Sequence, residues 1–334
     1  MEKIDFVITW VDGNDPEWLQ ERKKYLTPAP EDENTGDCRY RDWDLLRYWF
    51  RGVEKNAPWV NKIFFVTCGH LPQWLDTGHP KLQIVRHQDF IPAGYLPTFN
   101  SNVIEFYLHR IPGLSEHFVY FNDDHFFLKE TKPERFFKKG LPCDIGGLFI
   151  YNRKSVFGTS VNLAVQLINE HFDKRETIRK AFTRWFNPAY PDNSLRNILY
   201  SGIKTHEFCG IFDHHLPQGF LKTTYEEVWE NCSEDLIRTS KNKFRQYGDV
   251  AFWVLRYWQL ASNRFAPYNV CKDGVYYIAS EQNLSAILDC ILNRRKKLLC
   301  LNDTKDTTNF EYLKQEIHRA FERILPEKCS FERI

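Results

Sequence analysis

The sequence predicts an α/β protein built on a mostly parallel, Rossmann-like sheet. Short apolar runs rich in β-branched and aromatic residues alternate with helix-periodic segments through residue 150, which is typical of strands joined by crossover helices. Two of these runs end in acid, at Asp12 and at Asp123-Asp124. Because ligands in open α/β sheets bind just beyond the carboxyl ends of the strands, these ends also mark the expected site.

The first half of the chain supplies most of the predicted sheet. Apolar stripes at helical spacing separate its strands, and polar or Pro-containing stretches mark the loops. In chain order we expect a strand in the apolar run 4–13, a short helix over 15–27, an acidic loop over 28–37, a helix capped by Asp42 and ending at Asn56, strands at 62–67 and 82–86, a helix opened by Ser101 or Asn102, and a strand at 117–124.

The second half begins with a helical block at 161–199, with Asp192 as its expected cap, and we expect this block to cover the carboxyl edge of the sheet. The implied organisation is a Rossmann-like part over 1–150, a helical insertion or lid over 151–210, and a C-terminal part over 211–334 that completes the same catalytic domain. Its expected elements are a His-rich turn at 213–217, helices at 246–260, 280–293 and 310–325, and strands at 275–278 and 297–301, the last ending in Asn302-Asp303.

Composition excludes some partners and leaves others open. Lys and Arg number 45 against 44 Asp and Glu, so the chain lacks the basic footprint of a nucleic-acid-binding protein. The 27 Phe, 16 Tyr and 10 Trp residues suit stacking on sugars or bases, although most aromatic rings fill cores. Composition therefore favours a carbohydrate ligand only weakly.

The cysteines and the start of the chain indicate the compartment. Nine cysteines without a C-x-x-C pair suggest neither a disulfide framework nor a zinc site, and they indicate a reducing environment. The amino terminus is acidic where a signal peptide would be basic, and no apolar run reaches 18 residues. We expect a cytoplasmic protein whose contact with a membrane, at its inner face, is peripheral and made through partners.

The adjacent carboxylates of Asp123 and Asp124 are the most informative candidates. Such a pair is mutually repulsive unless a cation or several donors lie between its members, which suits a divalent metal that holds a diphosphate. Asp12 and Asn302-Asp303 add oxygen ligands at the ends of two other strands. The alternative is that each acid is a turn former or a helix cap.

Three further features have both a chemical and a structural interpretation. A histidine of His214-His215 can act as a general base or bond to loop carbonyls. Arg245 can clamp a phosphate while Asp249 orients it, or the two can form a surface ion pair. Glu105 is expected to complete a helix cap with Asn102.

No Walker loop, G-x-G-x-x-G, H-E-x-x-H or G-x-S-x-G motif is present. P-loop kinases, classical dehydrogenases, zincins and α/β-hydrolases are therefore disfavoured. An acidic, metal-dependent nucleotide-sugar site fits the residues best.

At these same residues the chain resembles the Stealth family, which includes bacterial capsular polysaccharide phosphotransferases and the catalytic subunit of animal GlcNAc-1-phosphotransferase. Four family blocks have counterparts in order, and together they cover most of the chain. They are the run from Ile4 to Asp15; the stretch from Arg39-Tyr40-Arg41-Asp42 through Leu96-Pro97-Thr98-Phe99 to Asn122-Asp123-Asp124; His214-His215-Leu216-Pro217 continuing to Arg245 and Asp249; and Cys300-Leu301-Asn302-Asp303.

The resemblance implies a glycosyltransferase A-like fold, Mg²⁺ or Mn²⁺ as cofactor, and transfer of a hexose 1-phosphate such as GlcNAc 1-phosphate from a UDP-sugar to a hydroxyl of a growing or lipid-linked glycan. UMP would be released and a phosphodiester of capsular polysaccharide formed. Asp12 stands where the animal enzymes have Asn, which puts direct metal ligation by Asp12 in doubt. The implied roles are catalysis by His215, Arg245, Asp249 and Asp123; substrate binding by Trp10, Asp12, Gly13, Arg39, Ser101, Asn122 and Asn302; and metal binding by Asp124 and Asp303.

Two rival functions remain open at the level of sequence. A conventional metal-dependent glycosyltransferase would use the same fold and release UDP instead of UMP. A non-enzymatic carbohydrate-binding protein would explain the aromatic residues, but it leaves the acidic strand ends and the His/Arg block without a task.

Overall fold

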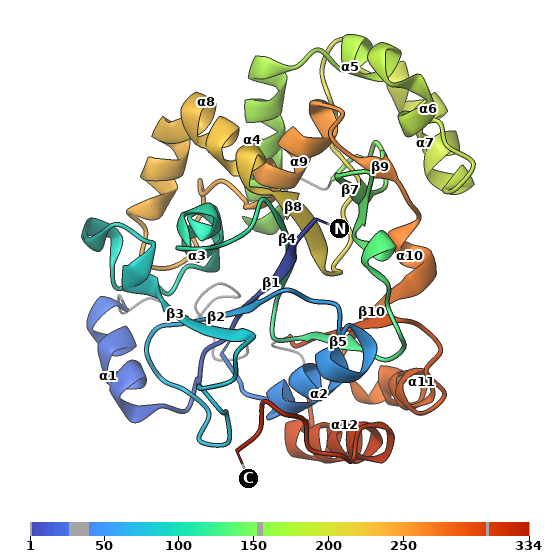
Figure 1. Cartoon of the computed structure of the whole chain (residues 1–334). Helices are drawn as coiled ribbons and strands as arrows, with labels where there is room; N and C mark the ends of the chain where they lie inside the picture. Colours follow the sequence, from blue (N-terminus) through green and yellow to red (C-terminus); the bar gives the residue numbers. More distant parts are fainter. Residues whose placement is uncertain (1, 27–39, 152–155, 305–306, 334) are drawn as a thin grey trace.

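A five-stranded sheet forms the centre of the molecule (Figure 1). This is a computed structural model, which describes residues 2–26, 40–151, 156–304 and 307–333. The strand order is β3-β2-β1-β4-β8, in which the first four strands are parallel and β8 pairs antiparallel with β4. The predicted α/β class with a Rossmann-like, mostly parallel sheet is confirmed. The strands are β1 (Ile4–Thr9), β2 (Ile63–Thr67), β3 (Leu82–Arg86), β4 (His117–Phe121) and β8 (Gln218–Leu221).

Helices cover both faces of this sheet, because the side chains of its strands alternate between two cores. In β1, Phe6 and Ile8 belong to one core and Val7 to the other. The first core also contains α2 (Leu46–Asn56), α11 (Glu281–Leu292) and α12 (Phe310–Ile324). The second contains α3 (Ser101–Phe106), α4 (Val156–His171), α8 (Lys222–Ser240) and α9 (Trp253–Ala261).

A smaller sheet brings the third acidic strand end to the main one. It has the order β10-β11-β5, with strands β10 (Gly274–Ile278), β11 (Leu298–Asn302) and β5 (His125–Phe127). Because β5 follows β4 after three residues, its antiparallel pairing with β11 sets Cys300 opposite His125. The Leu301 amide donates to the Asp124 carbonyl at 2.9 Å, so the chain ends of β4 and β11 meet.

A third, three-stranded sheet and several short helices complete the described fold. The sheet has the order β6-β7-β9, with strands β6 (Phe137–Lys138), β7 (Leu141–Asp144) and β9 (Ala266–Pro267). The short helices are α1 (Pro16–Tyr25), α5 (Lys174–Lys180), α6 (Phe182–Trp185), α7 (Pro191–Ser201) and α10 (Val270–Asp273). Among the described residues, no helix is both long and apolar enough to cross a membrane.

One part of the segment 151–210 packs in the core, and another part extends from the body of the protein. Its first helix, α4, packs against α9 inside the second core, whereas α5, α6 and α7 extend away from the sheet (Figure 1). A lid formed by this segment stays a prediction, as do the three-part boundaries. Strand β8, which lies within residues 211–334, pairs with β4 at the edge of the main sheet.

Several local predictions are wrong. The N-cap of α2 is Leu45, and the Asp42 carboxylate instead accepts from the Asp44 amide at 2.7 Å. Asp192 lies in the first turn of α7 behind Pro191. The helix expected from residue 246 begins at Trp253, because residues before it form a turn. The sequence analysis also missed β8 and α8. The loop expected over 28–37 lies outside the described residues.

Candidate active site

Two adjoining pockets lie at the carboxyl ends of β1, β4 and β11. Both are lined by Trp10, Val11, Tyr40, Asp123 and Asp124, so they form one cleft. We call the first the acidic pocket; its further walls include Arg41, Asp42, Trp43, Asn302 and Asp303. We call the second the aromatic pocket; its further walls include Trp18, Phe99, Ser101, Glu105, Asn122 and Arg245.

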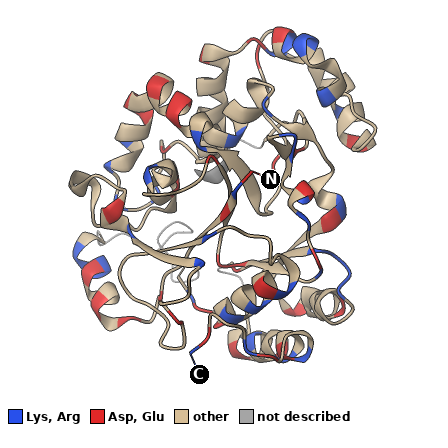
Figure 2. Cartoon of the chain, in the orientation of Figure 1, with Lys and Arg blue, Asp and Glu red and all other residues tan. Residues whose placement is uncertain are grey.

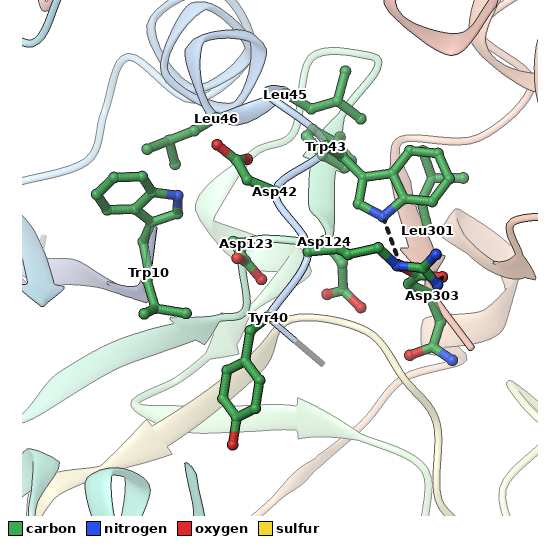
Figure 3. A pocket seen from close by; sticks show the side chains of 14 residues that line it. Trp10, Tyr40, Asp42, Trp43, Leu45, Leu46, Asp123, Asp124, Leu301 and Asp303 are labelled. Atoms are coloured by element: carbon green, nitrogen blue, oxygen red, sulfur yellow. Dashed lines mark hydrogen bonds and ion pairs between the residues drawn. The ribbon is translucent and has the colours of Figure 1, made fainter. Parts of the chain in front are cut away.

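The carboxylates of Asp42, Asp123 and Asp124 gather in the acidic pocket between Trp10 and Trp43 (Figure 3). Asp123 is open to the cleft but surrounded by protein. Loss of hydration, followed by repulsion from Asp124 and Asp42, raises the pKa of its carboxyl well above the usual value. Burial likewise raises the pKa of Asp124, to about 6. Among the described residues, no Lys or Arg lowers the pKa of Asp123 or Asp124.

Two side chains hold Asp124 from behind. The Cys300 thiol donates to Asp124 Oδ2 at 3.4 Å, and His125 Nε2 lies 3.5 Å from Oδ1. Since His125 Nδ1 accepts from the Asn122 amide at 3.0 Å, the proton of this neutral ring is on Nε2 and faces Asp124. Burial lowers the pKa of His125 to about 3, which keeps the ring neutral. These contacts orient Asp124.

Asp303 is already engaged by a cation. Arg41 reaches it with Nε and Nη2, each at 2.9 Å, and the Trp43 indole donates at 3.3 Å. A forked Arg–carboxylate contact of this kind is strong and directional. Metal ligation by Asp303 therefore stays a prediction, and Asp42 is the third carboxylate that directly faces the pair.

The donor set of the acidic pocket fits a hard divalent cation. Magnesium binds through one or two carboxylates together with substrate phosphates, and it keeps several waters. Asp124 Oδ1 is buried and accepts no hydrogen bond, which leaves a ligand position unused. Asp124, His125 and Cys300 also bring one possible ligand atom each within 4.8 Å of one another, but His125 Nδ1 accepts from the Asn122 amide and its Nε2 carries the inferred proton, so neither ring nitrogen offers a lone pair to a metal.

The aromatic pocket places Arg245 beside Ser101, to whose hydroxyl it donates. Glu105 lies deeper and is 3% exposed. Its Oε1 accepts from the Tyr120 hydroxyl at 2.9 Å, and its Oε2 has no hydrogen-bond partner. The helix cap predicted for Glu105 is wrong, because the N-cap of α3 is Asn100. Burial raises the pKa of Glu105 to about 7, against the lowering effect of Arg245.

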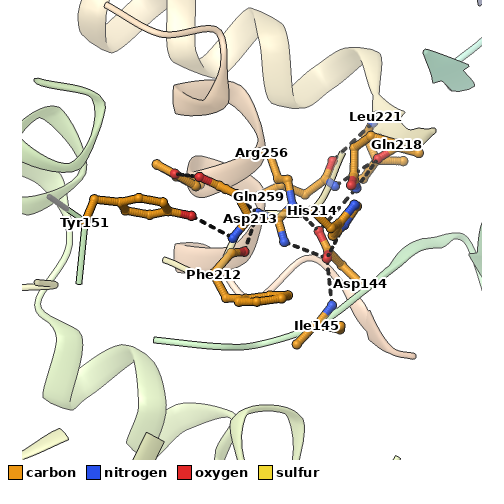
Figure 4. Close-up of polar contacts among 12 residues, drawn as sticks. Asp144, Ile145, Tyr151, Phe212, Asp213, His214, Gln218, Leu221, Arg256 and Gln259 are labelled. Atoms are coloured by element: carbon orange, nitrogen blue, oxygen red, sulfur yellow. Dashed lines mark hydrogen bonds and ion pairs between the residues drawn. The ribbon is translucent and has the colours of Figure 1, made fainter. Parts of the chain in front are cut away.

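The two adjacent histidines have different surroundings. His214 is 6% exposed, and its Nε2 lies 3.3 Å from Asp144 within a buried polar network (Figure 4). His215 is accessible, and its ring packs on Tyr276 at 4.9 Å between centroids. Partial enclosure and then the Arg245 charge lower the pKa of His215, so its ring is neutral near pH 7 and able to accept a proton.

Tyr276 links His215 to the cleft. Burial, and then the charges of Cys300 and Asp124, raise the pKa of Tyr276 to about 12, whereas a hydrogen bond with Asn302 lowers it. His215 lines neither pocket, and its ring contacts Tyr276.

Asp249 acts on the loop that carries Arg245. Its carboxylate is 1% exposed and accepts from Asn100 at 2.9 Å, from Asn242 at 2.5 Å and from the Gln246 amide at 3.0 Å. The predicted surface ion pair is therefore wrong, and a direct catalytic role for Asp249 lacks the necessary access. Its contacts fix the loop, and with it the position of Arg245.

Asp12 and Gly13 shape the edge of the site. The Asp12 carboxylate accepts from the Asn14 amide at 2.9 Å, and its own amide donates to His70 at 2.7 Å. A Cβ on Gly13 would come within 1.7 Å of the Tyr40 carbonyl oxygen, so only glycine fits. Neither residue lines the pockets. Arg39 lies outside the described residues.

Sequence reasoning missed Arg41, Asp42, Trp43 and Glu105 as wall residues. Arg41 and Asp42 were visible in the sequence as part of a family block, but Asp42 also satisfied the pattern of a helix cap. No signal in the sequence indicates that the carboxylate of Glu105 is buried in the wall of the aromatic pocket.

Similarity to known proteins identifies the family of this chain. The chain matches three family models, described as Stealth protein conserved region 1 over residues 2–27, conserved region 2 over 39–143 and conserved region 4 over 289–334. It is 42% identical to a capsular polysaccharide phosphotransferase WcwK of Streptococcus pneumoniae, with all of both chains covered. The chain belongs to the Stealth family.

Other relatives of similar length carry related names. The receptor polysaccharide phosphotransferase WefC of Streptococcus oralis is 38% identical, with 99% of this chain and 100% of the relative covered. The exopolysaccharide phosphotransferase cps2G of Lactiplantibacillus plantarum is 35% identical, with 99% and 96% covered. Among solved structures, the apo structure of the bifunctional glycosyltransferase WbbM aligns with 96% of this chain and 52% of its own, at 8% identity and a TM-score of 0.39.

Proposed function

We propose that this Stealth-family protein transfers a hexose 1-phosphate from a UDP-sugar to a hydroxyl of a growing or lipid-linked glycan, and thereby builds phosphodiester links of capsular polysaccharide. The observation that carries the proposal is the cleft in which uncompensated carboxylates and Arg245 lie together. Phosphoryl transfer depends on positioning and charge neutralisation, which such a set provides. The names of the full-length relatives support phosphotransfer in capsule synthesis.

The acidic pocket would hold the diphosphate of the donor. Asp124 and Asp123 would bind Mg²⁺ or Mn²⁺, with Asp42 facing them and Asp303 as a further candidate. When bound, the cation neutralises phosphate charge and orients the leaving group. Arg41 would remain paired with Asp303, and its guanidinium would form part of the pocket wall. Trp10, Asn122 and Asn302 would contact the nucleotide or the sugar.

His215 and Arg245 would act on the reacting groups. His215, held neutral, would accept the proton of the acceptor hydroxyl as that oxygen attacks the sugar-linked phosphorus. The bond from this phosphorus to the bridging oxygen of UMP would break, and UMP would leave with that oxygen. Arg245, positioned by Ser101 and by the loop fixed on Asp249, would neutralise charge on the transferred group.

Isotope labelling tests which bond breaks. The oxygen that joins sugar to phosphate in the UDP-sugar is replaced by a heavy isotope, and the products are separated after reaction with a primer glycan. We expect UMP, with the label in a new phosphodiester between sugar and phosphorus. Label recovered in released UDP, and a product free of phosphorus, would show a conventional glycosyltransferase.

A further inference from the structure

Helix α7 has an inverted arrangement of polar and apolar side chains. Asn193 and Asn197 face inward and are 8% and 0% exposed. On its outer side, Leu195, Ile198 and Leu199 are 60%, 61% and 64% exposed. A surface helix normally buries its apolar stripe, so this helix presents to solvent the face that would otherwise be hidden.

Asn197 makes this orientation part of the fold. Its Oδ1 accepts from the Leu148 amide at 2.6 Å, and its Nδ2 donates to the carbonyls of Gly146 at 2.7 Å and Trp185 at 2.5 Å. Rotating the helix to bury its apolar face would leave these buried backbone groups without partners, which is unfavourable. The apolar face is therefore held outward.

The exposed apolar surface extends beyond α7. Ile203, just after the helix, is 42% exposed, and Phe182 on α6 is 58% exposed. We call Phe182, Leu195, Ile198, Leu199 and Ile203 the α6–α7 patch. The buried Lys174 ammonium donates to the carbonyls of Ile203 at 2.5 Å and Lys204 at 2.7 Å, which fixes the end of the patch.

This part of the chain is basic although the protein as a whole is nearly neutral. Residues 174–206 contain seven Lys and Arg against two Asp and Glu, a net charge of +5, whereas the whole chain carries +1. Basic residues, coloured blue in Figure 2, cluster on α5 and α6. Arg175 and Arg179 are exposed there, and the exposed Lys180 pairs with Glu176 at 2.7 Å. An apolar face bordered by cations is complementary to an anionic bilayer, whose headgroups pair with the cations while the acyl region takes up the apolar side chains.

We propose that the α6–α7 patch docks this protein directly on an anionic membrane surface. A second copy is a poorer occupant, because a symmetric contact through this patch would oppose the same basic residues on both chains. Docking would hold the enzyme at the surface where a lipid-linked acceptor is presented, but the inference does not depend on the proposed reaction.

Vesicle flotation tests the proposal without catalysis. The full chain is mixed with vesicles of phosphatidylcholine, or of phosphatidylcholine with phosphatidylglycerol, and the fraction that floats is measured at low and high salt. We expect flotation with the anionic vesicles, reduced by salt. The triple variant Leu195→Ser, Ile198→Ser, Leu199→Ser should lower partitioning by at least about tenfold, since three aliphatic contacts are lost.

Two further variants sharpen the result. Arg175→Gln with Arg179→Gln should lose binding to anionic vesicles, whereas Tyr312→Ser, which removes an aromatic side chain 53% exposed on α12, should float like the wild type. Near-ultraviolet circular dichroism checks that each variant is folded. The proposal would be overturned if the wild-type protein stayed in the dense bottom fraction, or if the triple variant floated as well as the wild type. It would also be overturned if sedimentation showed a dimer of the wild type that the triple variant does not form.

Discussion

Asp144 and Asp124 are both enclosed carboxylates, but the protein treats them in opposite ways. Asp144 is 0% exposed and receives Arg256 Nε and Nη2, each at 2.8 Å (Figure 4). Burial would raise its pKa, but Arg256 and His214 lower the pKa below the usual value. Asp124 has no Arg or Lys partner among the described residues, only a thiol and a neutral imidazole. Its pKa moves upward.

This difference separates a structural acid from a functional one. Arg256 also donates to the Phe212 carbonyl at 2.8 Å and to Asp213 at 2.9 Å, so the network ties β7 to α9 and to the turn before His215. A compensated cluster adds rigidity, whereas an uncompensated one keeps charge available for a ligand. The first cluster supports the cleft, and the second forms its floor.

The largest expected effect comes from breaking the compensated cluster. Arg256→Met should lower the free energy of unfolding by about 3–5 kcal/mol, because it leaves the Asp144 charge buried without a partner. Urea denaturation followed by circular dichroism measures the change. The double change Arg256→Met with Asp144→Leu should recover part of the stability, because Asp213 still lacks its Arg256 partner; a double variant no more stable than Arg256→Met would show that the loss reflects packing and not the Asp144 charge.

Breaking the uncompensated cluster should affect turnover and spare stability. Asp124→Asn should reduce the rate of nucleotide release by about a hundredfold or more, as loss of a major electrostatic group does. Its unfolding free energy should equal or exceed that of the wild type, since a repulsive charge is removed. A variant as active as the wild type, or one as unstable as Arg256→Met, would show that the two clusters do not differ in this way.

The pH dependence of turnover sharpens the role given to His215. Because its pKa lies below the usual value, the neutral base should persist until the pH falls below about 6.5. Removing the nearby positive charge in Arg245→Gln should move the acid limb of the residual kcat/KM to higher pH, whereas Arg245→Lys should leave the limb in place. If the acid limb lies at the same pH in both variants as in the wild type, a group other than His215 accepts the proton.

The smallest expected effect is a change in the pH dependence of stability. Without a cation, the raised folded-state pKa of Asp123 means that the folded protein binds more protons than the unfolded chain, so stability should fall as pH rises from the unfolded value toward the raised one. Asp144 has the opposite sign: its stabilisation is complete above the unfolded pKa and is lost as pH falls through the folded pKa. Thermal unfolding of Asp123→Asn across this range should show a flatter profile than the wild type, and an unchanged profile would remove Asp123 from the cluster.

The sequence predicted the sheet and its acidic edge because both follow local patterns. The apolar runs that form β1, β2, β3 and β4 are long enough to predict strands. The acids at the edge follow β1 and β4 within a few residues, so they are visible in the same local pattern. Four-residue β8 is too short for a periodic signal, and the polar sequence of α8 hides its buried face.

The partners of each acid could not be predicted, because they come from distant segments. The Arg41–Asp303 contact joins residues 262 positions apart, and the Arg256–Asp144 contact joins residues 112 positions apart. The local sequence around an Asp that follows a strand is the same whether or not a distant Arg forms an ion pair with it. The inversion of α7 was equally hidden, since its apolar spacing is that of an ordinary buried helix.

The central claim is that the charges of Asp123 and Asp124 are left uncompensated by the described protein groups and bind a divalent cation, and thermal unfolding with added Mg²⁺ tests it most directly. Binding to the folded protein alone adds about 2.7 kcal/mol when the cation is a hundredfold above its Kd, so the wild-type melting temperature should rise. The rise should be larger near about pH 8 than near about pH 5, where protons compete. Asp192→Asn, which removes an exposed acid from α7, should respond like the wild type, and Asp124→Asn should not respond. A wild-type protein indifferent to saturating Mg²⁺ and Mn²⁺, or an Asp124→Asn variant stabilised as much as the wild type, would contradict the account.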